Sequence, residues 1–352
     1  MDIKKLIDQI KFNCNLSDAR FWGYYSICGL LLRMRELYKS EKGLKPWERV
    51  PADDVSRWIG ERERLWQSLE TEDFQSIEID DRKYDPFEVE AINKLLNREG
   101  FLYGAGLGTF GKPTFFLSLL KEKREILDYN LFIAGDELCR DLSTSIAMLQ
   151  GICIFLRTEP LGIILWEKVE EMRSRNFKGL LDRAFSFYRI GNESGPSILY
   201  EDIKTIADDI SEIFIYHEVG EAVEDRYPQL QGLATDDRWL ELHLRGIKDL
   251  LADTSDRGPL KLIIERRDER LLCFYLLFLD GIRRSLFPEA MNSFQDYSDS
   301  GDWMRIEEAR LKGYDRAKGL MEDISGFLMV REDLSSIKEY LTKRLQGLNI
   351  KS

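Results

Sequence analysis

The hydrophobic periodicity of the chain changes between about residues 101 and 158, and this change limits the possible fold more than any other feature. The runs "YNLFIAG" and "GICIFLR" are short, apolar and bounded by glycine, which is typical of β-strands. On both sides of this segment, apolar residues recur at helical spacing. We therefore predict a predominantly helical α+β protein. It has an N-terminal helical part (1–100), a small insert with short strands (101–158) and a C-terminal helical domain (159–352).

Capping and turn residues predict where the elements of the first half begin and end. Ser17 is a candidate N-cap for a long helix that continues to Gly43, and Pro51 marks the start of another helix. The stretch "NREG" at 97–100 resembles a helix end, so the residues after it make a poor strand. We predict a helix for "DELCRDLSTSIAML", whereas "TFFLSLLKEK" fits a strand or a helix.

The second half contains a candidate central helix. Pro259 can begin a helix that continues through Phe287 and is apolar on every side in its middle. Asp280 either forms an intrahelical ion pair with Arg283 and Arg284 or directs its carboxylate to the histidines described below. The stretch "MNSFQDYSDSGD" at 291–302 has the composition of a linker.

The stretch "GLGTFGKPT" contains G-x-x-x-x-G-K from Gly106 to Lys112, which is the beginning of a phosphate-binding loop. Such a loop requires a Ser or Thr hydroxyl directly after the lysine, and Pro113 occupies that position. Proline also removes one backbone N–H from the phosphate cradle. We therefore expect a glycine-rich connection leading into the sheet, not a nucleotide site.

Charge and composition bear on partners and compartment. The chain of 352 residues carries a net charge of −12, and its basic residues are scattered among acidic ones, so we expect no nucleic acid partner. The longest apolar run, at 271–279, is far shorter than the ~20 residues that span a bilayer, so we expect no membrane insertion. The sequence lacks a secretory signal and has five dispersed cysteines without a C-x-x-C pair, which predicts a cytoplasmic protein.

The most informative region contains both histidines of the chain. At about 100° of rotation per residue, the side chains of one helix face form a stripe that His217 continues. Glu221 and Glu224 extend the same stripe, so the core-facing side of this helix becomes polar in its last turns. The apolar members of the stripe are Ile203, Ile206, Ile210, Ile213 and Phe214.

A second helix follows a connection that contains Pro228 and Gly232, and His243 lies at the centre of its apolar stripe. His217 is about eight residues from the end of its helix, and His243 is about eight from the start of the next, or ~12 Å in each case. If the two helices pack as an antiparallel hairpin, both imidazoles reach the same level of the shared interface.

Two imidazoles and a carboxylate at one level would bind one divalent metal ion, either zinc or iron. In this hypothesis His217, Glu221 and His243 are ligands, and Glu224 is a ligand or orients one. Glu218 would act on a bound water as general base. The string "HEVGE" shares two residues with the zinc-peptidase motif H-E-x-x-H, but Glu221 replaces the second histidine, which argues against a peptidase.

Other interpretations of the cluster remain open. A His-Glu-His cluster can pin two helices together without metal, or it can perform acid-base chemistry without metal. A di-iron bundle is a weaker alternative, because it would want E-x-x-H pairs and Phe214 and Leu240 lie three residues before the histidines. No G-x-S-x-G nucleophile motif occurs.

The stretches "FGKPTFF", "LWEKVEE", "HEVGE" and "NCNLSDARFWGYYSICGLLLRMRELYKSE" together resemble a bacterial family of uncharacterised full-length proteins. The resemblance covers most of the chain and implies a cytoplasmic bacterial protein. It supplies no catalytic residues.

Two functional classes follow. One is a divalent-metal-binding protein or metal-dependent hydrolase with its site between two antiparallel helices. The other is a non-enzymatic helical scaffold that binds a protein partner or forms a homo-oligomer. Four tryptophans in charged helices or near linkers are either interface anchors for such a partner or covers over the core. They are Trp47, Trp58, Trp66 and Trp303.

Overall fold

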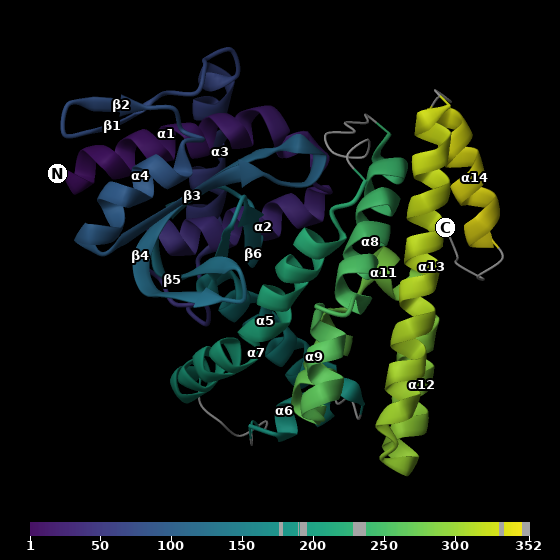
Figure 1. Cartoon of the computed structure of the whole chain (residues 1–352). Coiled ribbons are helices and arrows are strands. Elements are labelled where there is room, and N and C mark those ends of the chain that lie inside the picture. The colour runs from purple at the N-terminus through teal and green to yellow at the C-terminus, as the bar shows by residue number, and fades with distance from the viewer. Residues whose placement is uncertain (176–178, 189, 191–195, 228–236, 331–333, 347–352) are drawn as a thin grey trace. The chain divides into compact units, whose positions relative to one another are not determined.

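The computed structural model describes residues 1–175, 179–188, 190, 196–227, 237–330 and 334–346. The chain divides into two compact units, Met1–Glu167 and Lys168–Ser352. The predicted fold class is confirmed, because helices predominate and one five-stranded sheet accompanies them. Figure 1 shows the elements with their labels.

The first unit contains the sheet and the helices that cover it. Its helices are α1 (Ile3–Phe21), α2 (Ile27–Glu41), α3 (Ala52–Leu69) and α4 (Val89–Leu96). Its strands are β1 (Ile77–Ile79), β2 (Arg82–Tyr84), β3 (Phe101–Leu107), β4 (Pro113–Ile126), β5 (Tyr129–Arg140), β6 (Ala147–Gln150) and β7 (Cys153–Arg157). Helix α5 (Thr158–Arg175) crosses the boundary between the two units.

The five-stranded sheet has the order β3-β4-β5-β7-β6. Its neighbouring strands are antiparallel except for β5 and β7, which are parallel. The first half of β4 is buried on both faces, which explains why its sequence, "PTFFLS", is a continuous apolar run without alternation. Leu6, Ile10 and Cys14 of α1 pack in the same core as the sheet and α4. Further along α1, Leu16 and Ala19 pack with α2 and α3.

Several sequence-based boundaries in the first unit are wrong. The residues after "NREG" form β3, and the predicted helix "DELCRDLSTSIAML" is instead the end of β5 and part of β6. Within β5, the side chains of Glu137 and Arg140 are buried and pair with each other at 3.3 Å between Oε2 and Nε. Ser17 is a buried residue within α1 whose hydroxyl donates to the carbonyl of Pro113, and Ser26 is the N-cap of α2.

The glycine-rich loop forms the turn between β3 and β4, as the sequence predicted. Its lysine, Lys112, is buried, and Nζ lies 3.1 Å from a carboxylate oxygen of Asp18 and 3.1 Å from one of Asp141. The ammonium group therefore neutralises two buried carboxylates of its own fold and is turned away from any ligand in the turn.

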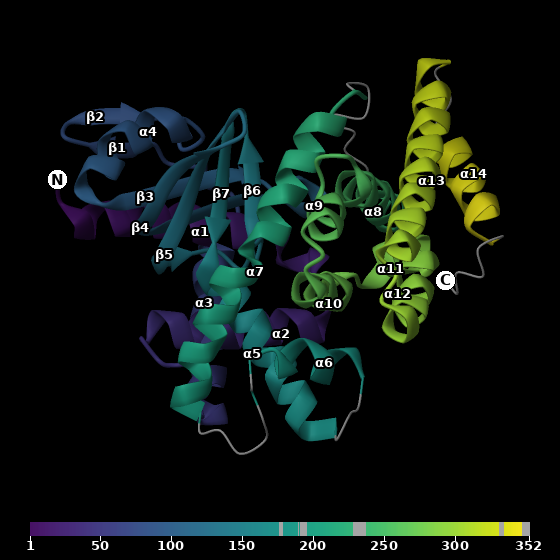
Figure 2. The ribbon, with the colours of Figure 1, turned by 60° about the horizontal axis from the view of Figure 1, so that its bottom comes forward.

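The second unit is helical throughout its described residues. Its elements are α6 (Leu180–Ser186), α7 (Pro196–Glu224), α8 (Arg238–Thr254), α9 (Pro259–Arg266), α10 (Glu269–Phe278), α11 (Gly281–Leu286), α12 (Pro288–Ser300), α13 (Trp303–Met329) and α14 (Leu334–Gln346). Helix α8 is central to this unit, because it packs against α7, α9, α11 and α13. Figure 2 shows α8 end-on beside α9, α11 and α13.

Two expectations for the second unit are also wrong. The long helix predicted from Pro259 is broken into α9, α10 and α11, because Arg267 adopts a left-handed conformation and Asp268 caps the next helix. The predicted linker at 291–302 is mostly α12, whose Phe294 and Tyr297 are buried on one face. No helix in the described part of the chain combines the length and the apolar character needed to cross a bilayer.

Candidate metal site

Helix α7 brings His217 to the core of the second unit. Four members of the predicted apolar stripe, Ile203, Ile206, Ile210 and Ile213, are buried, and the fifth, Phe214, is partly buried. Three residues after His217, the α7 and α8 backbones approach so closely that a Cβ atom on Gly220 would lie 2.3 Å from the carbonyl oxygen of Ala252. This close crossing sets which part of α8 faces His217.

His217 is held by Asp253, near the end of α8. Its Nδ1 lies 2.7 Å from Oδ1 of Asp253. The second oxygen of Asp253, Oδ2, accepts hydrogen bonds from the hydroxyl of Tyr275 at 3.3 Å and from Nη1 of Arg283 at 3.1 Å. The Asp253 carboxylate is therefore buried with three donors around it, and they come from α7, α10 and α11.

The charges of this pair shift both pKa values. Burial by itself lowers the pKa of His217, but the charge of Asp253 and the hydrogen bond to it outweigh burial and raise the pKa to about 10. Burial by itself raises the pKa of Asp253, but the charge and hydrogen bond of His217 and the charge of Arg283 lower it. In the metal-free protein at neutral pH, the two groups therefore form a charged pair.

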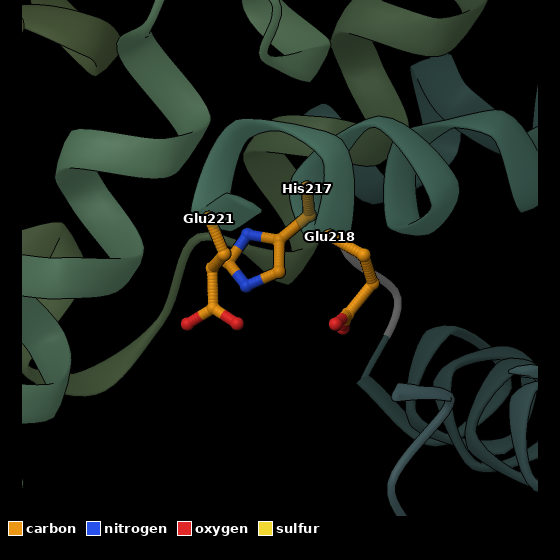
Figure 3. Close-up of side chains that lie close together, drawn as sticks. All are labelled: His217, Glu218 and Glu221. Atoms are coloured by element: carbon orange, nitrogen blue, oxygen red, sulfur yellow. The ribbon is translucent and has the colours of Figure 1, made fainter. Parts of the chain in front are cut away.

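Two glutamates of α7 lie beside the other ring nitrogen of His217. Figure 3 shows the carboxylates of Glu218 and Glu221 on either side of the imidazole, both extended beyond the ring. One donor atom from each of these three residues lies within 4.8 Å of the others. Glu218 is buried, whereas His217 and Glu221 are partly buried.

Glu224 lies one turn further along α7 and has a different environment. One of its oxygens accepts a hydrogen bond from the hydroxyl of Tyr314 at 3.1 Å. Glu224 and Glu221 line a narrow cavity of about 20 Å³ together with Lys248, Leu251 and Met321. That volume holds roughly one water molecule.

The structure does not bring His243 to this cluster. Nδ1 of His243 lies 2.7 Å from the carbonyl oxygen of Trp239, and the imidazole stacks on the Trp239 ring at a centroid distance of 3.7 Å. The residue of α8 level with His217 is Asp253, which is ten residues after His243, or ~15 Å along the helix axis. The predicted alignment of the two imidazoles is therefore wrong.

The misalignment results from the stagger between the two helices. Glu224, the last residue of α7, shares its cavity with Lys248, in the second half of α8. The first half of α8 therefore extends beyond the end of α7, and His243 lies in that overhang. Burial lowers the pKa of His243, and no carboxylate offsets this effect as Asp253 does for His217.

Sequence reasoning missed Asp253 and its donors Tyr275 and Arg283. The available signal was a carboxylate at 253, three residues after Leu250 on the apolar stripe of α8, a position where burial without a partner would be costly. Both expectations for Asp280 are wrong. This residue is exposed at the start of α11, and Arg283 pairs with Asp253 instead.

Comparison with protein families places the chain in a family. Residues 5–157 match the N-terminal domain, and residues 163–344 match the C-terminal domain, of a family of unknown function, DUF6866. The chain belongs to this family. Comparisons with curated proteins and with solved structures find no match.

Proposed function

We propose that the protein binds one divalent metal ion through His217, Glu218 and Glu221. The observation that supports this most directly is the hydrogen bond between Nδ1 of His217 and Asp253, because it directs Nε2 toward the two glutamates. A histidine that binds metal through one nitrogen commonly donates its other N–H to a carboxylate. Asp253 therefore orients the ligand and does not itself bind the ion.

The distances suit an ion with small side-chain adjustments. Bonds of ~2.1 Å place neighbouring ligands of a tetrahedral ion ~3.4 Å apart. The three donor atoms here lie within 4.8 Å of one another, so rotation about the glutamate side-chain bonds is sufficient to close the site. One nitrogen and two carboxylate oxygens favour zinc or ferrous iron.

The proposed role is metal binding and not hydrolysis. The adjacent cavity of about 20 Å³ has room for roughly one water molecule and is too small for a substrate. Glu218, which the sequence suggested as a general base, is one of the three candidate donors. A carboxylate that binds the ion is not free to deprotonate its water. Glu224 is held by Tyr314 and would contact solvent in the cavity beside the ion.

A second candidate function is a metal-free helical scaffold. It is favoured by the network around Asp253, which already satisfies both carboxylate oxygens with donors from three helices. In that case the His217–Asp253 pair would fix α7, α8, α10 and α11 together, and the protein would act by binding a partner.

Elemental analysis of untagged protein, purified without chelator, distinguishes the two functions. We expect near-stoichiometric zinc or iron that disappears in Glu221→Gln. Glu212→Gln is the matched control, because Glu212 lies on the same helix and pairs with Arg266 away from the site. The metal should remain in this control. Metal-free wild-type protein that also fails to bind added Zn²⁺ by calorimetry would exclude the metal site and favour the scaffold.

A further inference from the structure

A large cavity lies within the first unit, which does not contain the candidate metal site. Its volume is about 840 Å³, within the range of pockets that hold small organic ligands. It is lined by α4 and the residues flanking that helix, by β5 and β7, by the β6–β7 turn and by one residue of β4. All of these elements belong to one compact unit, so the cavity is a feature of that unit alone.

One wall of the cavity is aromatic. Phe132 on β5 and Phe155 on β7 are register partners in the parallel pair, and their rings stack at a centroid distance of 5.4 Å. Phe87, which precedes α4, contributes a third aromatic side chain and is 42% exposed. Phe132 and Phe155 are 6% and 1% exposed and form the floor of the cavity, so Phe87 offers most of the accessible aromatic surface to a ligand ring.

The cavity also contains cations without carboxylate partners. Nζ of Lys123 lies 5.1 Å from the centroid of the Phe132 ring. In the described part of the chain, neither Lys123 nor Arg98 has a carboxylate within ion-pair distance, although both line the cavity. Lys94, by contrast, is paired with Glu90 at 3.0 Å. The lining also contains the carboxylates of Glu88 and Glu90, so its three cations leave one excess positive charge at this cavity, in a chain whose net charge is −12.

We propose that this cavity is a binding site for a small aromatic anion. The ring would pack against Phe87 over the floor formed by Phe132 and Phe155, and the acid group would pair with Lys123 in the field of Arg98. The cationic and aromatic side chains lie together on the β4–β5 pair, where Lys123 and Phe132 are register partners.

Calorimetry with two probes of similar shape tests the proposal. 2-Naphthoate carries the acid group, and 2-naphthalenemethanol is its neutral counterpart. We expect one molecule of 2-naphthoate to bind per chain, at least tenfold more tightly than the alcohol, and more weakly as salt screens the charges. Lys123→Gln should remove most of this preference, because glutamine keeps a polar side chain at this position but carries no charge.

Arg124→Gln is the matched control. Arg124 is the next residue of β4, points to the opposite face of the strand and pairs with Glu122 outside the cavity. The affinity of the Arg124→Gln variant for 2-naphthoate should stay within twofold of the wild-type affinity. The proposal is overturned by absence of saturable binding at millimolar 2-naphthoate, by equal affinity for the two probes, or by equal effects of the two substitutions.

Discussion

Asp253 illustrates how one carboxylate determines the chemistry of its neighbours. It accepts from His217, Tyr275 and Arg283 while almost completely buried, so its removal leaves a guanidinium group and an imidazole without their acceptor. Breaking a buried ion pair by removing one partner typically costs about 3–5 kcal/mol. The same removal frees the imidazole to rotate away from a metal ion.

We predict that Asp253→Asn lowers the free energy of unfolding by about 3 kcal/mol in chelator. It should also weaken zinc binding by about 10–100-fold, as loss of a partner that orients a ligand does elsewhere. Urea unfolding and zinc calorimetry measure the two effects. Asp249→Asn, one turn earlier in α8, is the control. Burial raises the pKa of Asp249 and so disfavours its charged form, and removal of that charge should therefore lower the unfolding free energy less. Equal losses in the two variants would contradict this role for Asp253.

Glu159, at the start of α5, makes stability depend on pH. Burial is the main cause that raises its pKa from 4.5 to about 7, and the charge of Glu137 contributes. The folded protein therefore binds this proton more tightly than the unfolded chain does. Stability is consequently highest below about pH 4.5 as far as Glu159 is concerned, and it declines as pH rises to about 7.

We predict that Glu159→Gln removes this decline, because the amide oxygen can still accept from the backbone N–H of Glu137 without acquiring charge. Relative to wild type, the variant should gain about 1–3 kcal/mol in unfolding free energy between pH 4.5 and pH 7.5. Urea unfolding across that range measures the difference, with the exposed Glu125→Gln as control. A constant difference at all pH values would refute the assignment.

The candidate site could be predicted from sequence only along a single helix. Helical periodicity placed His217, Glu221 and Glu224 on the core-facing side of α7, and all three are partly buried, whereas Glu218, outside that stripe, is buried. The partner on α8 depends on the stagger between two helices, which local periodicity does not specify. For that reason His243 was expected where Asp253 lies.

At the scale of elements, the close crossing of α7 and α8 depends on Gly220. Its replacement by alanine would place Cβ 2.3 Å from the Ala252 carbonyl oxygen, so the helices would have to separate. Alanine favours a helix by about 1 kcal/mol over glycine, but the clash involves backbone atoms that cannot rotate away.

We therefore predict that Gly220→Ala lowers the free energy of unfolding by about 1–3 kcal/mol, as overpacking does in other cores. Gly319→Ala on α13 is the matched control, because nothing lies within 4 Å of its added Cβ. This control should gain up to about 1 kcal/mol from helix propensity. Urea unfolding of both variants measures the contrast, and effects of the same sign would show that the crossing is not tight.

The elements themselves were predictable where burial follows periodicity. The apolar runs at the start of β5 and in β7 were predicted as strands, and Pro51 correctly marked the start of α3. The errors occur where charged residues are buried, as in Glu137 and Arg140 of β5, or where a single left-handed residue such as Arg267 ends a helix. Neither the burial of a charged residue nor a single left-handed residue can be recognised from the local hydrophobic pattern of the sequence.

At the scale of the whole molecule, the division of the structure agrees with the division of the family. The compact units meet at residues 167 and 168, and the two family domains meet between residues 157 and 163. Helix α5 spans this region. The structure groups α1 to α4 with the sheet in one unit, because α1 packs on both the sheet and the other helices.

We predict that residues 1–175 fold without the rest of the chain. All five strands of the sheet have their partners within this fragment, and both of its main hydrophobic clusters lie inside it. The fragment keeps α5 because the Trp166 ring packs against Trp47 at a centroid distance of 5.9 Å. Circular dichroism and amide NMR should give one cooperative unfolding transition and dispersed signals.

A shorter fragment, residues 1–145, is the control for this prediction. It lacks β6 and β7, so β5 loses its parallel partner and Phe132 loses the ring of Phe155. The missing strands expose one edge and part of the core, and this fragment should unfold without cooperativity or aggregate. If the 1–175 fragment were equally disordered, the first unit would depend on the second for its stability, and the two family domains would be a single folding unit.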